Sequence, residues 1–263
     1  MAKKNKKNNK KKLNELTVIK LVPHALTVGA LCMGLFAVRY SIIGSFTWAS
    51  LCILVACFLD GIDGRVARKL NVASDFGAEM DSLADFFNFG VAPGFVMYFW
   101  KMNEYTCIKG IGWLPVLLLA VCMAIRLARF NVSLNNYNPN NPLQKYFFQG
   151  IPAPMAALLV LLPLLISLDF ENVQFVHSPL FIILNTSIVA ILAGSTIPTP
   201  CFKKITFKNN HKNLLVLIMA VVLVCLCFKP WTTLIVFAIV YVISIVASWF
   251  FYISFKNEMS SKK

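Results

Sequence analysis

Long apolar runs recur along the whole chain, and they restrict its fold more than any other feature. Each is close to the roughly 20 residues that a helix needs to cross the hydrocarbon core of a bilayer. The runs cover approximately residues 23–43, 46–70, 75–100, 111–127, 151–168, 179–195, 213–228 and 231–254. Hydrophobic residues make up 58% of the chain and charged residues 14%, which excludes an ordinary soluble domain. The sequence therefore predicts an all-α, polytopic transmembrane helical bundle of about eight spans.

The chain is expected to have three parts. Residues 1–22 comprise a lysine-rich arm with no means of packing, at 1–12, and a short interfacial helix, at 13–22, that ends before Pro23. Residues 23–204 form the main membrane domain, and residues 205–263 form a C-terminal transmembrane hairpin with a basic tail. Within the third span, Gly90 and Pro93 are expected to bend the helix, because proline removes a backbone hydrogen bond.

The net charge of +14 is explained better by membrane topology than by a nucleic-acid partner. No basic groove interleaved with aromatic residues accompanies the charge, so we expect no nucleic-acid binding. With the N-terminus in the cytoplasm, nearly all of the 25 Lys and Arg residues fall on the cytoplasmic side. Those on the opposite side are Arg39, Lys101, Lys109 and Lys229. This distribution predicts a multi-pass protein of the inner membrane with both termini in the cytoplasm, where the cations also attract anionic lipid.

Four aspartates occur at helical spacing near the end of the second span and near the start of the third. Asp60 and Asp63 are three residues apart, and Asp81 and Asp85 are four apart, so each pair shares one helix face. Carboxylates gathered near membrane depth repel one another unless a positive charge lies among them, and ionisable residues there are usually functional. One or two hard divalent cations, Mg²⁺ or Mn²⁺, would satisfy these oxygen ligands. Both ends of this stretch lie on the predicted cytoplasmic side, so the site is expected to open there.

The structural alternative is that the aspartates pair with Arg65, Arg68 and Lys69 in the connection between the spans. Four aspartates on two facing surfaces exceed what these exposed cations require, which favours the metal site. The eight cysteines offer no alternative metal centre, because they are scattered and form no CxxC pair.

The same stretch is similar to the signature of the CDP-alcohol phosphotransferase family. Eight positions match at fixed spacing: Asp60, Asp63, Gly64, Ala67, Arg68, Gly77, Asp81 and Asp85. The resemblance implies a helical bundle, commonly a homodimer, that binds two divalent metals at its cytoplasmic edge. It implies that Asp60, Asp63, Asp81 and Asp85 are the metal ligands and that Asp85 is also the catalytic base. It further implies that Gly64, Ala67, Arg68 and Gly77 shape the pocket for the CDP moiety.

Other segments resemble one branch of this family, the integral-membrane phosphatidylserine synthases of bacteria and archaea. The segments are DSLADFFNFGVAP at 81–93, RLARFN at 126–131, FQGIPAPMAA at 148–157 and IPTPCFKK at 197–204. The resemblance implies transfer of a phosphatidyl group from CDP-diacylglycerol to L-serine, with release of CMP. A cation should then meet the serine carboxylate. Arg126 and Arg129 share a helix face and are candidates, although a topology-determining role at the helix end explains them equally well.

Three other functions compete with this hypothesis. The same transfer could go to another alcohol, such as glycerol 3-phosphate, an inositol phosphate or choline, although a phosphorylated acceptor should need a denser basic pocket. An intramembrane prenyltransferase also uses Mg²⁺ and a diphosphate, but its Asp-rich helices lack this spacing of Gly, Ala and Arg. A cation transporter would use intramembrane carboxylates without any lipid turnover.

Overall fold

The computed structural model describes residues 2–70, 74–104, 110–135, 147–170, 173–196, 198–200 and 212–261. The described residues form two compact units, Met1–Val96 and Met97–Lys263. The sequence also predicts a polar, Asn- and Pro-rich loop after residue 131 and a basic loop before residue 212, and both fall largely outside the described residues. The division into 1–22, 23–204 and 205–263 stays a prediction.

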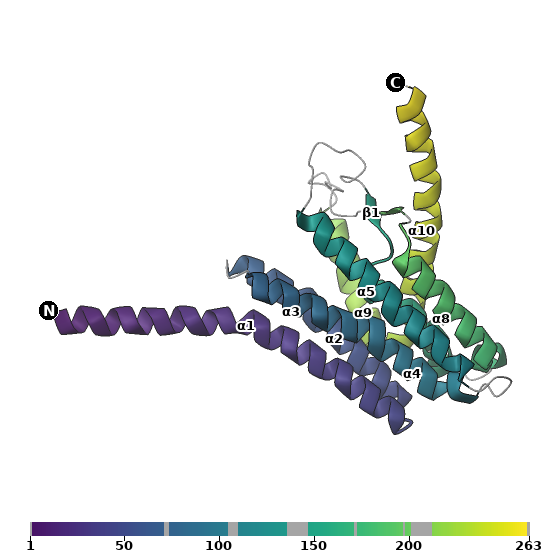
Figure 1. The fold of residues 1–263 in the computed structure, drawn as a ribbon, viewed down its shortest axis with the longest axis horizontal. Helices are drawn as coiled ribbons and strands as arrows, with labels where there is room; N and C mark the ends of the chain where they lie inside the picture. The colour runs from purple at the N-terminus through teal and green to yellow at the C-terminus, as the bar shows by residue number, and fades with distance from the viewer. Residues whose placement is uncertain are drawn as a thin grey trace. The chain divides into compact units, whose positions relative to one another are not determined.

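The first unit contains the segments that carry the aspartates. Its helices are α1 (Ala2–Ile42), α2 (Phe46–Lys69), α3 (Asp75–Asp85), the π-helix η1 (Phe86–Val91) and the start of α4 (Ala92–Trp100). A tight turn at Gly44, where φ is +84°, joins α1 to α2, and these two helices lie side by side (Figure 1). Helix α1 also packs against α3 and η1, so it touches both segments that carry aspartates.

The third predicted span changes its helical register directly after the aspartates. The backbone N–H of Ala92 donates to the carbonyl of Phe87, five residues back, which is the bonding pattern of a π-helix. Pro93 follows and has no N–H to donate, so the expected irregularity near Gly90 and Pro93 takes this form. Asn88 of η1 is buried against Gly34 of α1, where an added Cβ would lie 2.1 Å from the Asn88 Oδ1. Gly34 therefore sets the close approach of α1 and η1.

The second unit contains the remaining segments. They are η2 (Met102–Glu104), η3 (Ile111–Trp113), α5 (Leu114–Asn135), β1 (Phe147–Gln149), α7 (Ala153–Asp169), η4 (Gln174–His177), α8 (Pro179–Gly194), β2 (Pro198–Pro200), α9 (Lys212–Phe228) and α10 (Pro230–Ser261). Helix α5 packs along α8 (Figure 1), and α7 contacts both α8 and α10. Strands β1 and β2 pair in antiparallel fashion, with Phe148 opposite Thr199.

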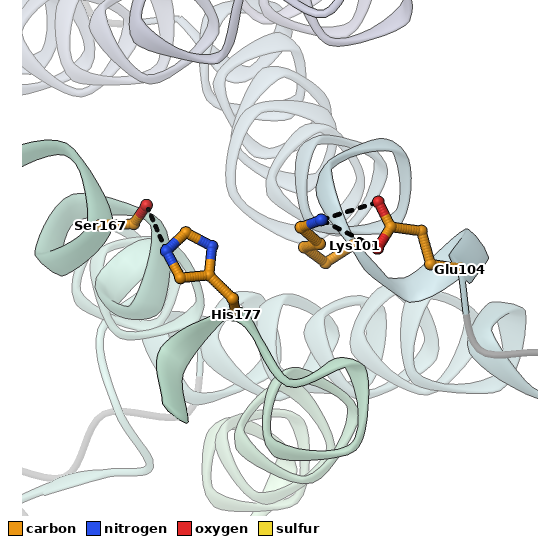
Figure 2. A network of polar contacts seen from close by, with 4 residues as sticks. All are labelled: Lys101, Glu104, Ser167 and His177. Carbon is orange, nitrogen blue, oxygen red and sulfur yellow. Dashed lines mark hydrogen bonds and ion pairs between the residues drawn. The ribbon is translucent and has the colours of Figure 1, made fainter. Parts of the chain in front are cut away.

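Polar contacts within this unit hold its short connections in place (Figure 2). The Oγ of Ser167 on α7 and the Nε2 of His177 on η4 lie 3.4 Å apart. Lys101 Nζ donates to Glu104 at 2.8 Å, which ties the residue after α4 to η2. Trp100 also packs on the His177 ring, with centroids 5.6 Å apart. These contacts explain His177, for which the sequence suggested no role.

The helices have the lengths and surfaces of a membrane protein. Three in the described part are long and apolar enough to cross a bilayer, namely Val22–Ile42, Phe46–Lys69 and Ile111–Ser133. Shorter apolar helices cover Ala153–Asp169, Pro179–Gly194 and Pro230–Ile245. Large apolar side chains such as Leu35, Phe58 and Ile188 are more than half exposed, which suits contact with lipid rather than water. The prediction of an all-α membrane bundle is confirmed.

One local expectation was wrong, and one local feature was not predicted. Helix α1 begins at Ala2 and continues through Pro23, whereas the sequence predicted an arm and a separate interfacial helix that ends before that proline. Lysine is a good helix former, and one interior proline removes a single hydrogen bond from a long helix. The pairing of β1 with β2 was also not foreseen, because each strand has only three residues and prolines begin and end β2.

Candidate metal and catalytic site

Three carboxylates meet where α2 and α3 face each other. Asp60, Asp63 and Asp81, which we call the aspartate cluster, each offer one oxygen, and these oxygens all lie within 4.8 Å of one another. Asp60 and Asp63 project from α2. Asp81 lies nearly two turns into α3, whose start is fixed because Ser74 Oγ accepts a hydrogen bond of 3.1 Å from the Gly77 N–H. The predicted meeting of the two aspartate pairs is therefore present for three of the four residues.

Asp85 lies beside the cluster at the end of α3. Its side chain is within hydrogen-bonding reach of Asp60, and it is partly buried. Two ionised carboxylates at that separation repel each other, and a divalent cation would relieve the repulsion. Asp85 is therefore a neighbour of Asp60 but not a member of the three-carboxylate cluster.

The environment of Asp63 fits an oxygen-ligated cation. Asp63 is only 3% exposed, and its Oδ2 accepts a hydrogen bond of 2.8 Å from Thr27 Oγ1. Its Oδ1 is buried and has no hydrogen-bond partner within the described part of the chain. A buried carboxylate oxygen without a partner is costly, so something must meet it in the working protein. Hard Mg²⁺ or Mn²⁺ is the ligand that a set of carboxylate oxygens prefers.

Ion pairing among the described residues does not supply that positive charge. Among the described residues, Asp60, Asp63 and Asp81 form no ion pair with Arg65, Arg68 or any other cation. The ion pair that the described residues do show joins Lys101 to Glu104 (Figure 2). The structural alternative, in which these aspartates pair with the cations near the end of α2, therefore lacks support.

The other motif residues of α2 lie on the same helix face as the aspartates. At 100° per residue, Asp60, Asp63, Gly64, Ala67 and Arg68 fall within an arc of about 140°. Gly64 and Ala67 are partly buried, and Arg68 is exposed in the last turn. An added Cβ at Gly64 would meet no atom within 4 Å, so the space beside this glycine is open. This open space agrees with, but does not test, the predicted approach of CDP to Gly64, Ala67 and Arg68.

Gly77 lies in a different environment from Gly64. An added Cβ at Gly77 would lie 2.8 Å from Cε1 of His24 on α1, and the His24 ring also packs edge-on against Phe76 at 5.7 Å. Gly77 therefore allows α1 to approach α3, and its assignment to CDP binding stays a prediction. Asp75 and Glu79 are exposed, as expected for residues outside the aspartate face.

These two environments predict opposite effects of the same substitution. Gly64→Ala should leave the fold intact or stabilise it by up to about 1 kcal/mol, because alanine is the better helix former. It should nevertheless lower turnover at least about tenfold by placing a methyl group where the substrate approaches. Gly77→Ala should destabilise the protein by about 1–3 kcal/mol through overpacking against His24. Thermal unfolding and initial rates, measured on both variants, check this. Equal loss of stability in both would contradict the distinction.

Arg126 and Arg129 belong to α5 in the second unit. Arg126 Nε donates to the carbonyl of Ile151, and Arg129 Nη1 donates to the carbonyl of Gly194, each at 2.5 Å. These bonds tie α5 to the start of α7 and the end of α8. Both arginines therefore have a structural task, and their predicted contact with serine stays a prediction.

Two residues at the site were missed by sequence reasoning, and both lie on α1. Thr27 contacts Asp63, and His24 contacts Gly77 and Phe76. The available signal was weak: two polar residues three apart on the first apolar span, next to a proline.

Comparison with known proteins agrees with this geometry. The chain matches the CDP-alcohol phosphatidyltransferase family over residues 20–192. It is 35% identical to the CDP-diacylglycerol–serine O-phosphatidyltransferase of Helicobacter pylori, covering 88% of this chain and 92% of the relative. Proteins of the same name from Mycobacterium bovis and Bacillus subtilis are 33% and 32% identical, over 85% and 72% of this chain and 76% and 94% of those relatives.

The helical membrane fold and a carboxylate cluster suited to divalent cations are features of membrane-embedded, metal-dependent enzymes. Within that class, this chain belongs to the CDP-alcohol phosphatidyltransferase family.

Proposed function

We propose that this chain transfers the phosphatidyl group of CDP-diacylglycerol to the hydroxyl of L-serine, giving phosphatidylserine and CMP. The observation that carries the proposal is the aspartate cluster, with its buried Asp63 oxygen that has no partner in the described residues. The names of the relatives support serine as the acceptor. Transfer to glycerol 3-phosphate, an inositol phosphate or choline is the alternative within the same family.

The metal would be held by Asp60, Asp63 and Asp81, with Asp85 close enough to complete the site. Bound Mg²⁺ or Mn²⁺, two ions by resemblance to the family, would neutralise the pyrophosphate charge that builds up as CMP departs. The carboxylates themselves fix where the pyrophosphate can lie, because they come from two helices whose separation is set by packing against α1.

Asp85 is proposed as the general base. A serine hydroxyl is a weak nucleophile and needs a base within hydrogen-bond reach. Asp85 takes the hydroxyl proton as the serine Oγ–P bond forms, and the bond between that phosphorus and the CMP oxygen breaks. Arg68, exposed two turns beyond Asp60 on the same face of α2, would contact a phosphate of the substrate. The space beside Gly64 is open, and this glycine together with Ala67 would give the nucleotide room beside that face.

The location of the site follows from the distribution of positive charge. The cations in the last turns of α2 and the lysines at both termini support a cytoplasmic orientation for the aspartate-bearing ends of the helices, at the inner membrane. CDP-diacylglycerol would enter from the bilayer, and L-serine and CMP would exchange with the cytoplasm. A homodimer is proposed by resemblance to the family.

The acceptor role of Arg126 and Arg129 leads to a separate prediction. If their guanidinium groups also meet the serine carboxylate, Arg126→Ala or Arg129→Ala should raise the apparent KM for serine about 10–100-fold, because a charge-assisted bond is worth about 1.5–3 kcal/mol. The KM for CDP-diacylglycerol should change little. Steady-state kinetics with each substrate varied in turn check this. If both variants keep the wild-type KM for serine, the arginines serve only their carbonyl contacts.

The acceptor is tested with purified protein in detergent, CDP-diacylglycerol and Mn²⁺ or Mg²⁺. L-Serine, glycerol 3-phosphate, an inositol phosphate and choline are each supplied as a labelled acceptor, and label in the lipid phase is counted together with CMP release. We expect label from serine alone. Label from another acceptor would overturn serine while keeping the phosphatidyl transfer. No CMP release with any acceptor would overturn the transfer itself and favour a prenyltransferase or a cation transporter.

A further inference from the structure

We propose that Thr27 is a positioning residue for the metal site, because its hydroxyl holds Asp63 in the orientation that presents Oδ1 to the cation. Thr27 lies outside the motif that identifies the family. The inference rests on the metal site of the proposed function, and it assigns to α1 a task beyond packing.

The contact has the geometry of an orienting hydrogen bond. Thr27 Oγ1 donates to Asp63 Oδ2 at 2.8 Å across the interface of α1 and α2. Both side chains are buried, with 5% of Thr27 and 3% of Asp63 exposed. A hydrogen bond to a carboxylate is stronger than one between neutral groups, and burial strengthens it further. The bond therefore restricts rotation of the carboxylate about its own axis.

The hydroxyl has a second acceptor within reach, and the two must be compared. Thr27 Oγ1 is 3.1 Å from the carbonyl of Pro23, one turn earlier in α1. A hydroxyl carries one proton, and that carbonyl is already placed to accept the helical N–H of residue 27. The Asp63 oxygen is closer and carries the charge, so it takes the proton. The short distance to Pro23 keeps the Thr27 rotamer aimed at α2.

Because of this hydrogen bond, the two oxygens of Asp63 have different roles. Asp63 Oδ2 accepts the hydrogen bond from Thr27, while Asp63 Oδ1 is buried and has no partner in the described residues. Asp63 is also the residue that lies with Asp60 and Asp81 in the aspartate cluster. One turn earlier on the same face of α1, His24 packs on Gly77 of α3. Helix α1 thus contacts both aspartate-bearing helices, and Thr27 is the residue of α1 that bonds to a proposed metal ligand, Asp63.

The test compares Mn²⁺ binding by wild-type protein, Thr27→Val and Thr27→Ser, measured from the free Mn²⁺ signal in electron paramagnetic resonance on metal-stripped protein without substrates. Valine keeps the shape of threonine and lacks the hydroxyl. We expect Thr27→Val to raise the Mn²⁺ dissociation constant about 10–100-fold, the usual effect of losing a group that orients a metal ligand. Thr27→Ser should stay within about threefold of wild type, because it keeps the donor.

Ser50→Ala is the matched control. Ser50 is fully buried on α2, and its hydroxyl donates to the carbonyl of Phe46 at 3.0 Å, so its loss removes a buried helix bond without touching an aspartate. We expect no change in Mn²⁺ affinity. In CMP release, Thr27→Val should raise the Mn²⁺ concentration needed for half-maximal rate and leave the rate at saturating Mn²⁺ within about threefold, a split that a general loss of folding would not produce.

Wild-type Mn²⁺ affinity in Thr27→Val would overturn the proposal, and so would equal losses in the serine and valine variants. If Thr27→Val does not fold, Thr27→Ala is compared with Thr27→Ser by the same criteria. The proposed function fails in a different way: wild-type protein binds Mn²⁺ but releases no CMP with any acceptor. In that case the binding comparison still decides whether Thr27 orients Asp63.

Discussion

Asp85→Asn is expected to lower serine-dependent CMP release by about 10³-fold, within the range of 10²–10⁴ that a positioned general base contributes. The amide keeps the shape of the side chain but cannot accept the proton of the serine hydroxyl. Because Asp60, Asp63 and Asp81 remain, binding of CDP-diacylglycerol should stay measurable. Initial rates and equilibrium binding of CDP-diacylglycerol, measured on the same preparation, separate the two effects.

Asp75→Asn serves as the control for that variant. Asp75 is an exposed carboxylate in the first turn of the same helix, outside the aspartate cluster. The Asp75→Asn variant makes the same chemical change on α3. We expect its activity to stay within about twofold of wild type, as for an exposed surface substitution. Wild-type rates in Asp85→Asn would remove Asp85 as the base.

Asp81→Asn should abolish activity for a different reason and should change stability in a direction that depends on metal. Without metal, the variant loses one of three crowded carboxylates, so its unfolding temperature should rise. With Mn²⁺ bound, the wild type should have the higher unfolding temperature. At 100 times the dissociation constant, a bound ion stabilises wild-type protein by about 2.7 kcal/mol, and the variant would lose most of that gain. Thermal unfolding with and without Mn²⁺, alongside CMP release, checks both effects.

Glu79→Gln is the control for Asp81→Asn, because Glu79 is an exposed carboxylate two residues earlier on α3. It should respond to Mn²⁺ as wild type does. If Asp81→Asn is stabilised by Mn²⁺ as strongly as wild type, Asp81 is not a ligand. The cluster would then need another explanation for its buried charge.

The sequence predicted the membrane bundle well, because apolar runs of bilayer length have few alternative folds. It also predicted that the aspartate pairs meet, since a spacing of three or four residues places each pair on one helix face. The irregularity near Gly90 and Pro93 was expected, but neither its form as a π-helix nor the close packing of Asn88 against Gly34 was predicted. Such a contact joins residues 54 positions apart and leaves no local pattern.

The contribution of α1 to the site was not predictable from the sequence for the same reason. Thr27 and His24 carry no motif, and their partners Asp63 and Gly77 are 36 and 53 residues away in the chain. Gly77 was assigned to the substrate pocket by resemblance, whereas its neighbour in the structure is the His24 ring. A motif states which residue types are required. The contacts show whether a given residue faces a ligand or another helix.

The central claim is that the aspartate cluster holds the metal on which phosphatidyl transfer depends. The most direct measurement is serine-dependent CMP release by purified protein that has been stripped with a chelator and then titrated with Mn²⁺ or Mg²⁺, in wild type and in Asp63→Asn. The account predicts no release from stripped wild-type protein, full recovery with metal, and no recovery in Asp63→Asn at the same metal concentration. Serine-dependent release that survives complete chelation, or that recovers equally in Asp63→Asn, would contradict it.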